Sequence, residues 1–246
     1  MDNFEEQFRS LLEEEDITYD VKGFITSNKD VYPLGTDTKV LSSVFELMVR
    51  PVIYNLADKY DKEVKEARAQ NYYPDFTIMK NEDDESKYAI DVKTTYKEKE
   101  SHTAKFTLGS YTSFMREGNE TKNIEFSYPQ YSEHWIVGFI YIREFPDKDQ
   151  DNIFGLEDVK QIPTPFSDVR HFVSPKWKIA GDKAGSGNTA NIGSIRGNIE
   201  DFRNENGVFN SESEFLQYWR NYERTASERE DKYSDIEEFR EWNSNQ

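Results

Sequence analysis

The chain has 246 residues, no cysteine and a formal net charge of −17, from 48 acidic and 31 basic side chains. This length is enough for one sizeable domain or two small ones. The absence of cysteine excludes disulfides, thiol nucleophiles and Cys-ligated zinc, and it fits a reducing cytoplasm. We expect no membrane span and no signal peptide, because long apolar runs and a basic N-terminal region are both missing. The excess of acid disfavours nucleic-acid binding, although a local basic cleft can exist on an acidic protein.

Two helices are predicted in the first quarter of the chain. Residues 3–15 place a row of Phe and Leu side chains on one side of an acidic, amphipathic helix. Residues 38–60 carry apolar side chains along most of their length, which indicates a long and largely buried helix. Pro51 within this stretch either kinks the helix or begins a second one.

The middle of the chain is predicted to form strands and the last part to form helices. The strand-like runs are residues 75–80, 87–95, 104–108 and 135–143. Residues 181–198 are rich in Gly, Asn and Ser, and they are predicted to form a loop. Two capping-box patterns, Ser211-x-x-Glu214 and Ser234-x-x-Glu237, precede aromatic-rich segments that we expect to be helical. This order of elements predicts one α/β domain over residues 1–246.

A β-hairpin is predicted over residues 73–95, because two strand-like runs flank a short polar stretch centred on Asp83. Residues that face one another across this hairpin have numbers that sum to 166, which places Asp75 opposite Asp91. Because side chains alternate along a strand, Lys93 shares the face of Asp91, and the apolar neighbours of both point the other way.

Two carboxylates in this register would have Cβ atoms about 4.5–5.5 Å apart. Their charges repel, so one of them would tend to stay protonated unless a divalent cation lies between them. Mg²⁺ is usually held by one or two carboxylates together with water and substrate phosphate. A lysine beside such a site can orient water or offset negative charge on a phosphate. The alternative at this point is an ordinary solvent-facing hairpin with its charges outward.

Pro74-Asp75, a spacer of 15 residues and Asp91-Val92-Lys93 together match the PD-(D/E)xK nuclease motif. The flanking sequence is more specific than this short motif. Over nearly the whole chain it resembles the EcoRV-like type II restriction endonucleases of that superfamily. The segments that carry the resemblance are residues 32–42, 70–77, 90–96, 180–189 and 218–225. The resemblance implies a restriction-endonuclease-like mixed β-sheet flanked by helices, in a single domain with DNA-binding loops.

For the active site, the resemblance implies that Asp75 and Asp91 bind metal and that Lys93 is the catalytic lysine. Glu46 matches a further acidic residue of the metal site, although without the family it reads equally well as a surface glutamate of a helix. The expected metal is Mg²⁺, with Mn²⁺ as a substitute, and the expected reaction is phosphodiester hydrolysis by direct attack of water. The three histidines of the chain show no metal-ligand spacing.

For recognition, the resemblance implies that the loop at 181–194 reads base edges in the major groove. Without the family, this segment reads as a plain flexible loop. The expected base-reading residues are Gly185, Gly187, Asn188 and Thr189. The implied target is GATATC, cut bluntly at its centre, and Ala190 departs from the family, where a second threonine is expected. Residues Gln70 and Asn71 resemble the segment that approaches the minor groove.

Further DNA contacts are expected with phosphates. The matching positions are Thr38, Lys39, Thr94, Thr95, Ser113, Lys122, Arg224, Thr225 and Arg229. The last three belong to a C-terminal helical, DNA-contacting part at 208–246. Ala226 replaces an expected serine and the basic tail is missing, so we expect weaker non-specific DNA binding than in a basic relative.

A palindromic DNA target implies a homodimer, with residues 17–35 and a stretch near 144–165 as the interface that the resemblance suggests. A cognate DNA methyltransferase is the expected functional partner, in the cytoplasm. Two alternatives stay open. Another nuclease of the superfamily, such as a nickase or repair enzyme, would share the active site but not the loop at 185–189. A non-catalytic acidic DNA mimic or interaction protein would need neither that loop nor Lys93.

Overall fold

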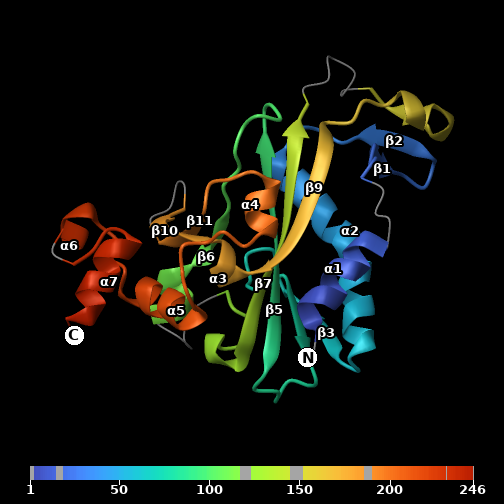
Figure 1. The fold of residues 1–246 in the computed structure, drawn as a ribbon. Helices are drawn as coiled ribbons and strands as arrows, with labels where there is room; N and C mark the ends of the chain where they lie inside the picture. Colours follow the sequence, from blue (N-terminus) through green and yellow to red (C-terminus); the bar gives the residue numbers. More distant parts are fainter. Residues whose placement is uncertain are drawn as a thin grey trace.

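A five-stranded mixed sheet, ordered β3–β4–β5–β7–β9, forms the centre of the computed structural model (Figure 1). Its strands are β3 (Glu63–Glu66), β4 (Phe76–Met79), β5 (Lys87–Lys97), β7 (Tyr131–Arg143) and β9 (Phe166–Pro175). Only the central pair β5–β7 is parallel, and the other neighbours run antiparallel. This arrangement confirms the predicted mixed sheet. The structure describes residues 3–14, 19–116, 123–144, 152–185, 190–230 and 232–245.

Two helices, α1 (Phe4–Glu14) and α2 (Thr38–Lys59), cover one face of this sheet (Figure 1). Both were predicted to within one residue. The Asp37 carboxylate begins α2 by accepting hydrogen bonds from the first backbone N–H groups of the helix. The helix then continues through Pro51, so the alternative of a second helix beginning there is wrong.

By length and composition alone, α2 could cross a membrane. Its side chains Phe45, Val49 and Ile53 are however fully buried against the sheet and α1. It is therefore a core helix of this domain, which agrees with the prediction of no membrane span.

The second layer lies on the other face of the large sheet and carries a small sheet ordered β10–β11–β6. Its strands are β6 (Thr107–Ser110), β10 (Ala180–Ala184) and β11 (Asn191–Ser194), and α3 (Lys176–Ile179) leads directly into β10. The prediction of a loop at 181–198 is therefore wrong at 181–184 and at 191–194, where backbone pairing makes strands. The strand predicted at 104–108 begins later, since Ala104 forms only an isolated bridge with Gly197.

Helices follow in the C-terminal part, as predicted. They are α4 (Ile199–Arg203), α5 (Glu212–Asn221), α6 (Ala226–Glu230) and α7 (Ile236–Ser244), and the last three stand beyond β10 and β11, opposite α1 and α2 (Figure 1). Ser211 caps α5 by accepting a hydrogen bond from Glu214 N. The cap of α7 is Asp235 rather than the predicted Ser234, because the Ser234 hydroxyl bonds the Glu238 carboxylate instead.

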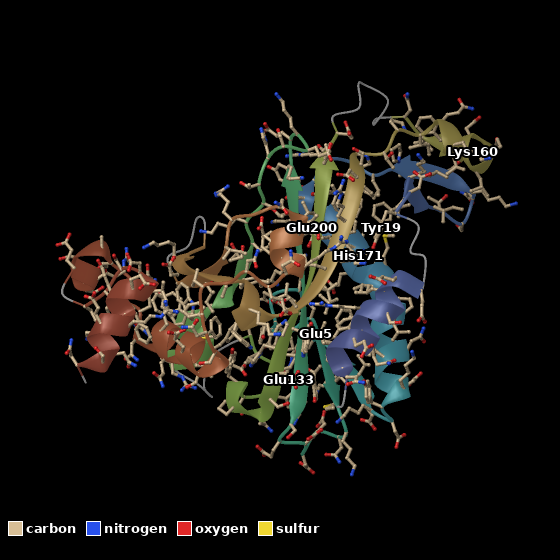
Figure 2. The ribbon with its side chains drawn as sticks, viewed as in Figure 1. Glu5, Tyr19, Glu133, Lys160, His171 and Glu200 are labelled. Carbon is tan, nitrogen blue, oxygen red and sulfur yellow. The ribbon has the colours of Figure 1, made fainter. Side chains whose placement is uncertain are left out.

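A third sheet, ordered β1–β2–β8, projects from the body of the molecule (Figure 1). Its strands are β1 (Gly23–Ile25), β2 (Asp30–Pro33) and β8 (Phe154–Gly155), followed by the 3₁₀ helix η4 (Leu156–Gln161). Tyr19, just before β1, lies with its hydroxyl 2.9 Å from Nδ1 of His171 on β9 (Figure 2). Two further turns complete the described elements, the π-helical η1 (Thr112–Arg116) and the 3₁₀ helix η2 (Tyr128–Gln130).

Candidate active site and DNA-binding cleft

The hairpin of β4 and β5 has the predicted register. Phe76 pairs with Ile90 and Thr77 with Ala89, so that partners sum to 166. Asp75 lies one residue before β4, and the same register brings it to the level of Asp91. Its carboxylate accepts a hydrogen bond of 2.6 Å from the backbone N–H of Val92. The hairpin therefore holds Asp75 against the segment that carries Asp91 and Lys93.

The charged groups of this site lie close together in a partly dry environment. Lys93 Nζ is 2.6 Å from Asp91 Oδ2, and the side chains are 25% and 4% exposed. Among the described residues this ion pair is the one polar contact of that buried oxygen, since no further hydrogen-bond donor reaches it. Burial by itself lowers the pKa of Lys93, but the charges of Asp91 and Asp75 outweigh it and leave that pKa raised. Lys93 is therefore a firmly protonated ammonium.

The Asp75 carboxyl has a strongly raised pKa. Burial, followed by the negative charge of Asp91, raises its pKa to about 8. Lys93 and the hydrogen bond from Val92 act in the opposite direction but are weaker. Two crowded and buried carboxylates are an environment that a divalent cation would relieve, because hard cations prefer oxygen ligands. The residues present thus fit such an ion.

Glu46 on α2 lines the same cleft as Asp75 and Lys93. Burial raises its pKa, Lys93 lowers it and Asp91 raises it again, so it belongs to the same electrostatic field. Within the described part of the chain, however, no three acidic, His or Cys side chains converge into a metal-binding group. Its predicted role at the metal site stays a prediction.

A cleft runs from the start of α2 across the end of the hairpin to β6. It brings together residues that lie far apart in the sequence and that were predicted to contact metal or DNA. Those predicted residues are Thr38, Lys39, Glu46, Gln70, Asp75, Lys93, Thr94 and Thr95. A neighbouring cleft shares Asp75 and Lys93 and adds Asn71, Asp91 and Ser113. Candidate phosphate, minor-groove and catalytic residues therefore surround one continuous site.

Three predicted phosphate contacts lie elsewhere. Arg224, Thr225 and Arg229 belong to the C-terminal helical part and line neither of these two clefts. The Arg229 guanidinium donates to the backbone carbonyls of Glu223 and Arg224, at 2.8 and 2.9 Å. The Thr225 hydroxyl donates to the Glu228 carboxylate at 2.5 Å and caps α6. In this arrangement both side chains stabilise their own segment.

The predicted base-reading loop is described only at its edges. Gly185 is buried after β10, and its N–H donates to the Asn191 carbonyl at 2.8 Å. Gly187, Asn188 and Thr189 lie outside the described residues, as does Lys122. The strands β10 and β11 thus close a hairpin whose tip is the predicted reading loop, and β11 also pairs with β6 beside the cleft.

Sequence reasoning missed several residues that line the site, and three polar ones illustrate this. Lys105 and Thr107 lie in the first cleft and Asn191 in the second. Lys105 and Thr107 could have been predicted together, because alternate residues of the strand predicted at 104–108 share one face. Burial and the nearby charge of Arg196 lower the pKa of Lys105. Asn191 carried no such signal, since it stands in a segment that was predicted as a loop.

Comparison with known proteins places this chain in a family. A family model described as restriction endonuclease EcoRV matches residues 15–244. The type II restriction enzyme EcoRV of Escherichia coli is 50% identical over 233 residues, which cover 95% of this chain and 94% of that protein. The match spans all three sheets and both clefts. The chain therefore belongs to the EcoRV family of type II restriction endonucleases, which are site-specific deoxyribonucleases.

Proposed function

We propose that this endonuclease cleaves double-stranded DNA at GATATC, leaves blunt ends and depends on Mg²⁺, which Mn²⁺ can replace. The observation that carries the chemistry is the pair Asp75 and Asp91, crowded beside the Lys93 ammonium at the bottom of the cleft. The target sequence rests on the likeness of residues 180–189 to the family and on the 50% identity with EcoRV.

Asp75 and Asp91 would hold the cation, with Glu46 as the third acidic group at the rim of the cleft. When bound, the cation would offset charge on the scissile phosphate and favour ionisation of an attacking water. Without a cation, burial lowers the pKa of Lys93, but Asp91, Asp75 and Glu46 outweigh it and leave that pKa raised. In this proposal the Lys93 ammonium donates a hydrogen bond and stabilises negative charge as the phosphorus is attacked. The hydrogen bond from Val92 keeps the Asp75 carboxylate aimed at this point.

The cleft explains how DNA would be oriented over the catalytic residues. Thr38 and Lys39 lie in the first turn of α2 and line the cleft, where their hydroxyl and ammonium groups would contact phosphates. Thr94 and Thr95 continue β5 beyond Lys93 and line the same wall. Gln70 and Asn71 face the minor groove in this proposal, while Gly185, Gly187, Asn188 and Thr189 read the major groove. Ser113, Lys122, Arg224, Thr225 and Arg229 are the remaining proposed phosphate contacts.

We further propose that the active form is a homodimer built on the sheet β1–β2–β8. Large apolar side chains are exposed on and next to this sheet, which is unusual for a free surface. They are Phe24 (54%), Ile25 (60%), Tyr32 (47%), Ile153 (57%) and Leu156 (42%). These residues fall in the two segments that were predicted as the interface, and two-fold symmetry suits a palindromic target. A cytoplasmic location and a cognate methyltransferase belong to the same proposal.

Plasmids that differ only in a single GATATC site test this function. With Mg²⁺, we expect the protein to linearise the plasmid that carries the site and to spare the other. Asp91→Ala should abolish cleavage, and Ca²⁺ in place of Mg²⁺ should preserve binding without hydrolysis. Indiscriminate cutting or nicking would support a nuclease of another specificity, and the absence of any cleavage would support the acidic DNA mimic.

A further inference from the structure

A buried lysine outside the catalytic set contacts the segment that carries Asp75. Lys176, the first residue of α3, is 2% exposed. Its ammonium donates a hydrogen bond of 2.7 Å to the Tyr73 hydroxyl. The same hydroxyl lies 2.6 Å from Nδ1 of His134 on β7. Three polar groups, each at most 6% exposed, thus form one chain inside the protein.

Burial disfavours this ammonium, and the Tyr73 hydroxyl together with the faces of the Tyr73 and Tyr128 rings, whose centroids lie 4.2 and 6.0 Å from Nζ, offsets only part of that cost. Burial lowers the pKa of Lys176 to about 7, with Asp91 and Glu212 raising it and Lys93 lowering it. Replacing a buried charge by an apolar side chain often leaves stability unchanged or increases it. Stability alone therefore does not explain a lysine at this position.

Tyr73 connects the buried chain to the active site. It stands two residues before Asp75 and lines the cleft shared by Asn71, Asp75 and Lys93. Its backbone N–H donates to the Asn123 carbonyl, and its ring stacks on Phe114 with centroids 4.9 Å apart. Segment 70–75, which carries both the proposed minor-groove residues and a proposed metal carboxylate, is therefore held in part by the Tyr73 side chain, beside the hydrogen bond from Val92 to Asp75.

Lys176 connects the same chain to the base-reading hairpin. It begins α3, which leads without interruption into β10 and then to Gly185 at the root of the predicted reading loop. In Figure 1, α3 lies between β7 of the large sheet and the small sheet of β10 and β11. The hydrogen bond from Lys176 to Tyr73 is thus a direct contact between the element that leads to the reading loop and the segment that leads to Asp75.

From this geometry we infer that Lys176 is a positioning residue, which acts through the Tyr73 hydroxyl to couple base reading by the β10–β11 hairpin to the placement of Asp75. A displacement of β10 when the wrong bases are met would shift the ammonium and, with it, segment 70–75. The inference rests on the proposed function, because it assumes that Asp75 serves the reaction.

Tyr73→Phe is the sharpest test, since it removes only the shared hydroxyl. The chain supplies a matched control in Tyr128, a neighbouring buried tyrosine that stacks on His134 with centroids 4.1 Å apart. The Tyr128 hydroxyl has no hydrogen-bond partner among the described residues, so Tyr128→Phe should leave cleavage unchanged. Lys176→Met removes the ammonium from the other end of the same hydrogen bond at similar volume.

Single-turnover cleavage in Mg²⁺ is measured on GATATC and on a site with one altered base pair, and DNA affinity is measured in Ca²⁺. For Tyr73→Phe we expect a cognate rate lower by roughly 10- to 100-fold, as for a lost hydrogen bond to a charged group. The rate at the altered site should fall less, so that the ratio of the two rates falls. Affinity in Ca²⁺ should change far less than the rate. A merely structural hydroxyl would lower thermal stability and leave the ratio of rates unchanged.

The double variant Tyr73→Phe/Lys176→Met decides whether the lysine acts through the tyrosine. If it does, the double variant cleaves no more slowly than the worse single variant, whereas independent roles multiply the two losses. Multiplied losses, or a Tyr73→Phe enzyme that behaves like Tyr128→Phe, would overturn the inference. If Lys176→Met does not fold, the ratio of rates in Tyr73→Phe still decides. A wild-type protein that cuts no DNA would contradict the proposed function rather than this inference.

Discussion

The Asp75 carboxylate accepts a hydrogen bond of 2.6 Å from the backbone N–H of Val92, the residue between Asp91 and Lys93. One strand of the hairpin thereby fixes the acidic group that precedes the other strand. The bond lowers the pKa of Asp75, yet burial and Asp91 raise it more. The hairpin therefore holds two carboxylates together against their own repulsion, an arrangement that costs stability and suits cation binding.

Asp75→Asn should raise the melting temperature of the protein in EDTA while it abolishes cleavage. The amide keeps the size of the side chain and removes a buried carboxyl that must either keep a poorly hydrated charge beside Asp91 or bind a proton on folding. Addition of Mg²⁺ should raise the melting temperature of the wild-type protein, because a ligand that binds only the folded state stabilises it, and should do so much less in the variant. Differential scanning fluorimetry with and without Mg²⁺ measures both effects.

Asp84 in the hairpin turn is the matched control for this substitution. Hydrogen bonds from the backbone N–H groups of Lys80 and Ser86 lower the pKa of its carboxyl. Asp84→Asn should therefore lower the melting temperature and leave cleavage intact. A variant Asp75→Asn that melts at or below the wild-type temperature in EDTA would contradict the picture of electrostatic crowding.

The same two residues predict opposite pH dependences in EDTA. The folded-state pKa of Asp75, about 8, lies above the value of about 3.9 for an unfolded aspartate. The folded state thus keeps a proton that the unfolded chain releases, and stability falls as pH rises between these values. Asp84 has a lowered pKa, so its contribution is present above the unfolded value and is lost as pH falls through the folded one. Unfolding of each variant relative to wild type isolates the two contributions when it is followed from about pH 2 to 9, because the Asp84 contribution is lost below about pH 3.9.

The catalytic hairpin could be predicted because its signals are local. A short polar stretch fixes the turn, and apolar alternation around Asp75 and Asp91 then fixes the register. The base-reading hairpin could not be predicted in this way. Its strands are rich in glycine and small polar residues, and they are held by backbone pairing with β6, which lies about 80 residues earlier in the chain.

The use of polar side chains was only partly predictable. Thr225-x-x-Glu228 has the pattern of a capping box, and the structure shows both of its hydrogen bonds. That local signal would have revealed that Thr225 caps α6. The binding of Arg229 to the carbonyls of Glu223 and Arg224 has no comparable pattern, because the bends of the chain around α6 create it. The link from Lys176 to Tyr73 joins residues 103 positions apart and was equally invisible.

Lys39→Ala should weaken DNA binding and reduce its salt dependence. Lys39 lies on the wall of the cleft, at the N-terminus of α2. If it neutralises one phosphate, the slope of log affinity against log salt should fall by about 0.9 for each lost contact, or about 1.8 for a dimer. Fluorescence anisotropy in Ca²⁺ at several salt concentrations measures this slope. Lys80→Ala, on the exposed hairpin turn, is the control that should leave the slope unchanged. Equal slopes for Lys39→Ala and wild type would remove Lys39 from the interface.

Ile25→Asp should convert the proposed dimer into monomers. Ile25 is 60% exposed on β1 and lies in the apolar surface of the β1–β2–β8 sheet. Burying an aspartate there would place a charge in an apolar interface, which is strongly unfavourable. Analytical ultracentrifugation should show a loss of the dimer, with a loss of double-strand cleavage. Leu47→Asp on α2, where the side chain is 59% exposed outside this sheet, should not change the oligomeric state. A wild-type protein that is monomeric in solution and bound to DNA would exclude this interface.

Gly185→Ala should impair recognition through crowding at the root of the reading loop. A Cβ at this position would come within 3.0 Å of the Thr107 hydroxyl and 3.3 Å of the Ile192 carbonyl. Thr107 lines the DNA-binding cleft and β11 carries Ile192, so the methyl group must push the hairpin and the cleft apart. Overpacking of this kind lowers folding stability by about 1–3 kcal/mol, and the displacement at the root of the loop should lower cognate affinity in Ca²⁺ relative to the wild-type protein. Gly35→Ala is the matched control, because a Cβ there meets no atom within 4 Å. If both substitutions leave cognate affinity and the ratio of cleavage rates unchanged, close packing at Gly185 does not support base reading.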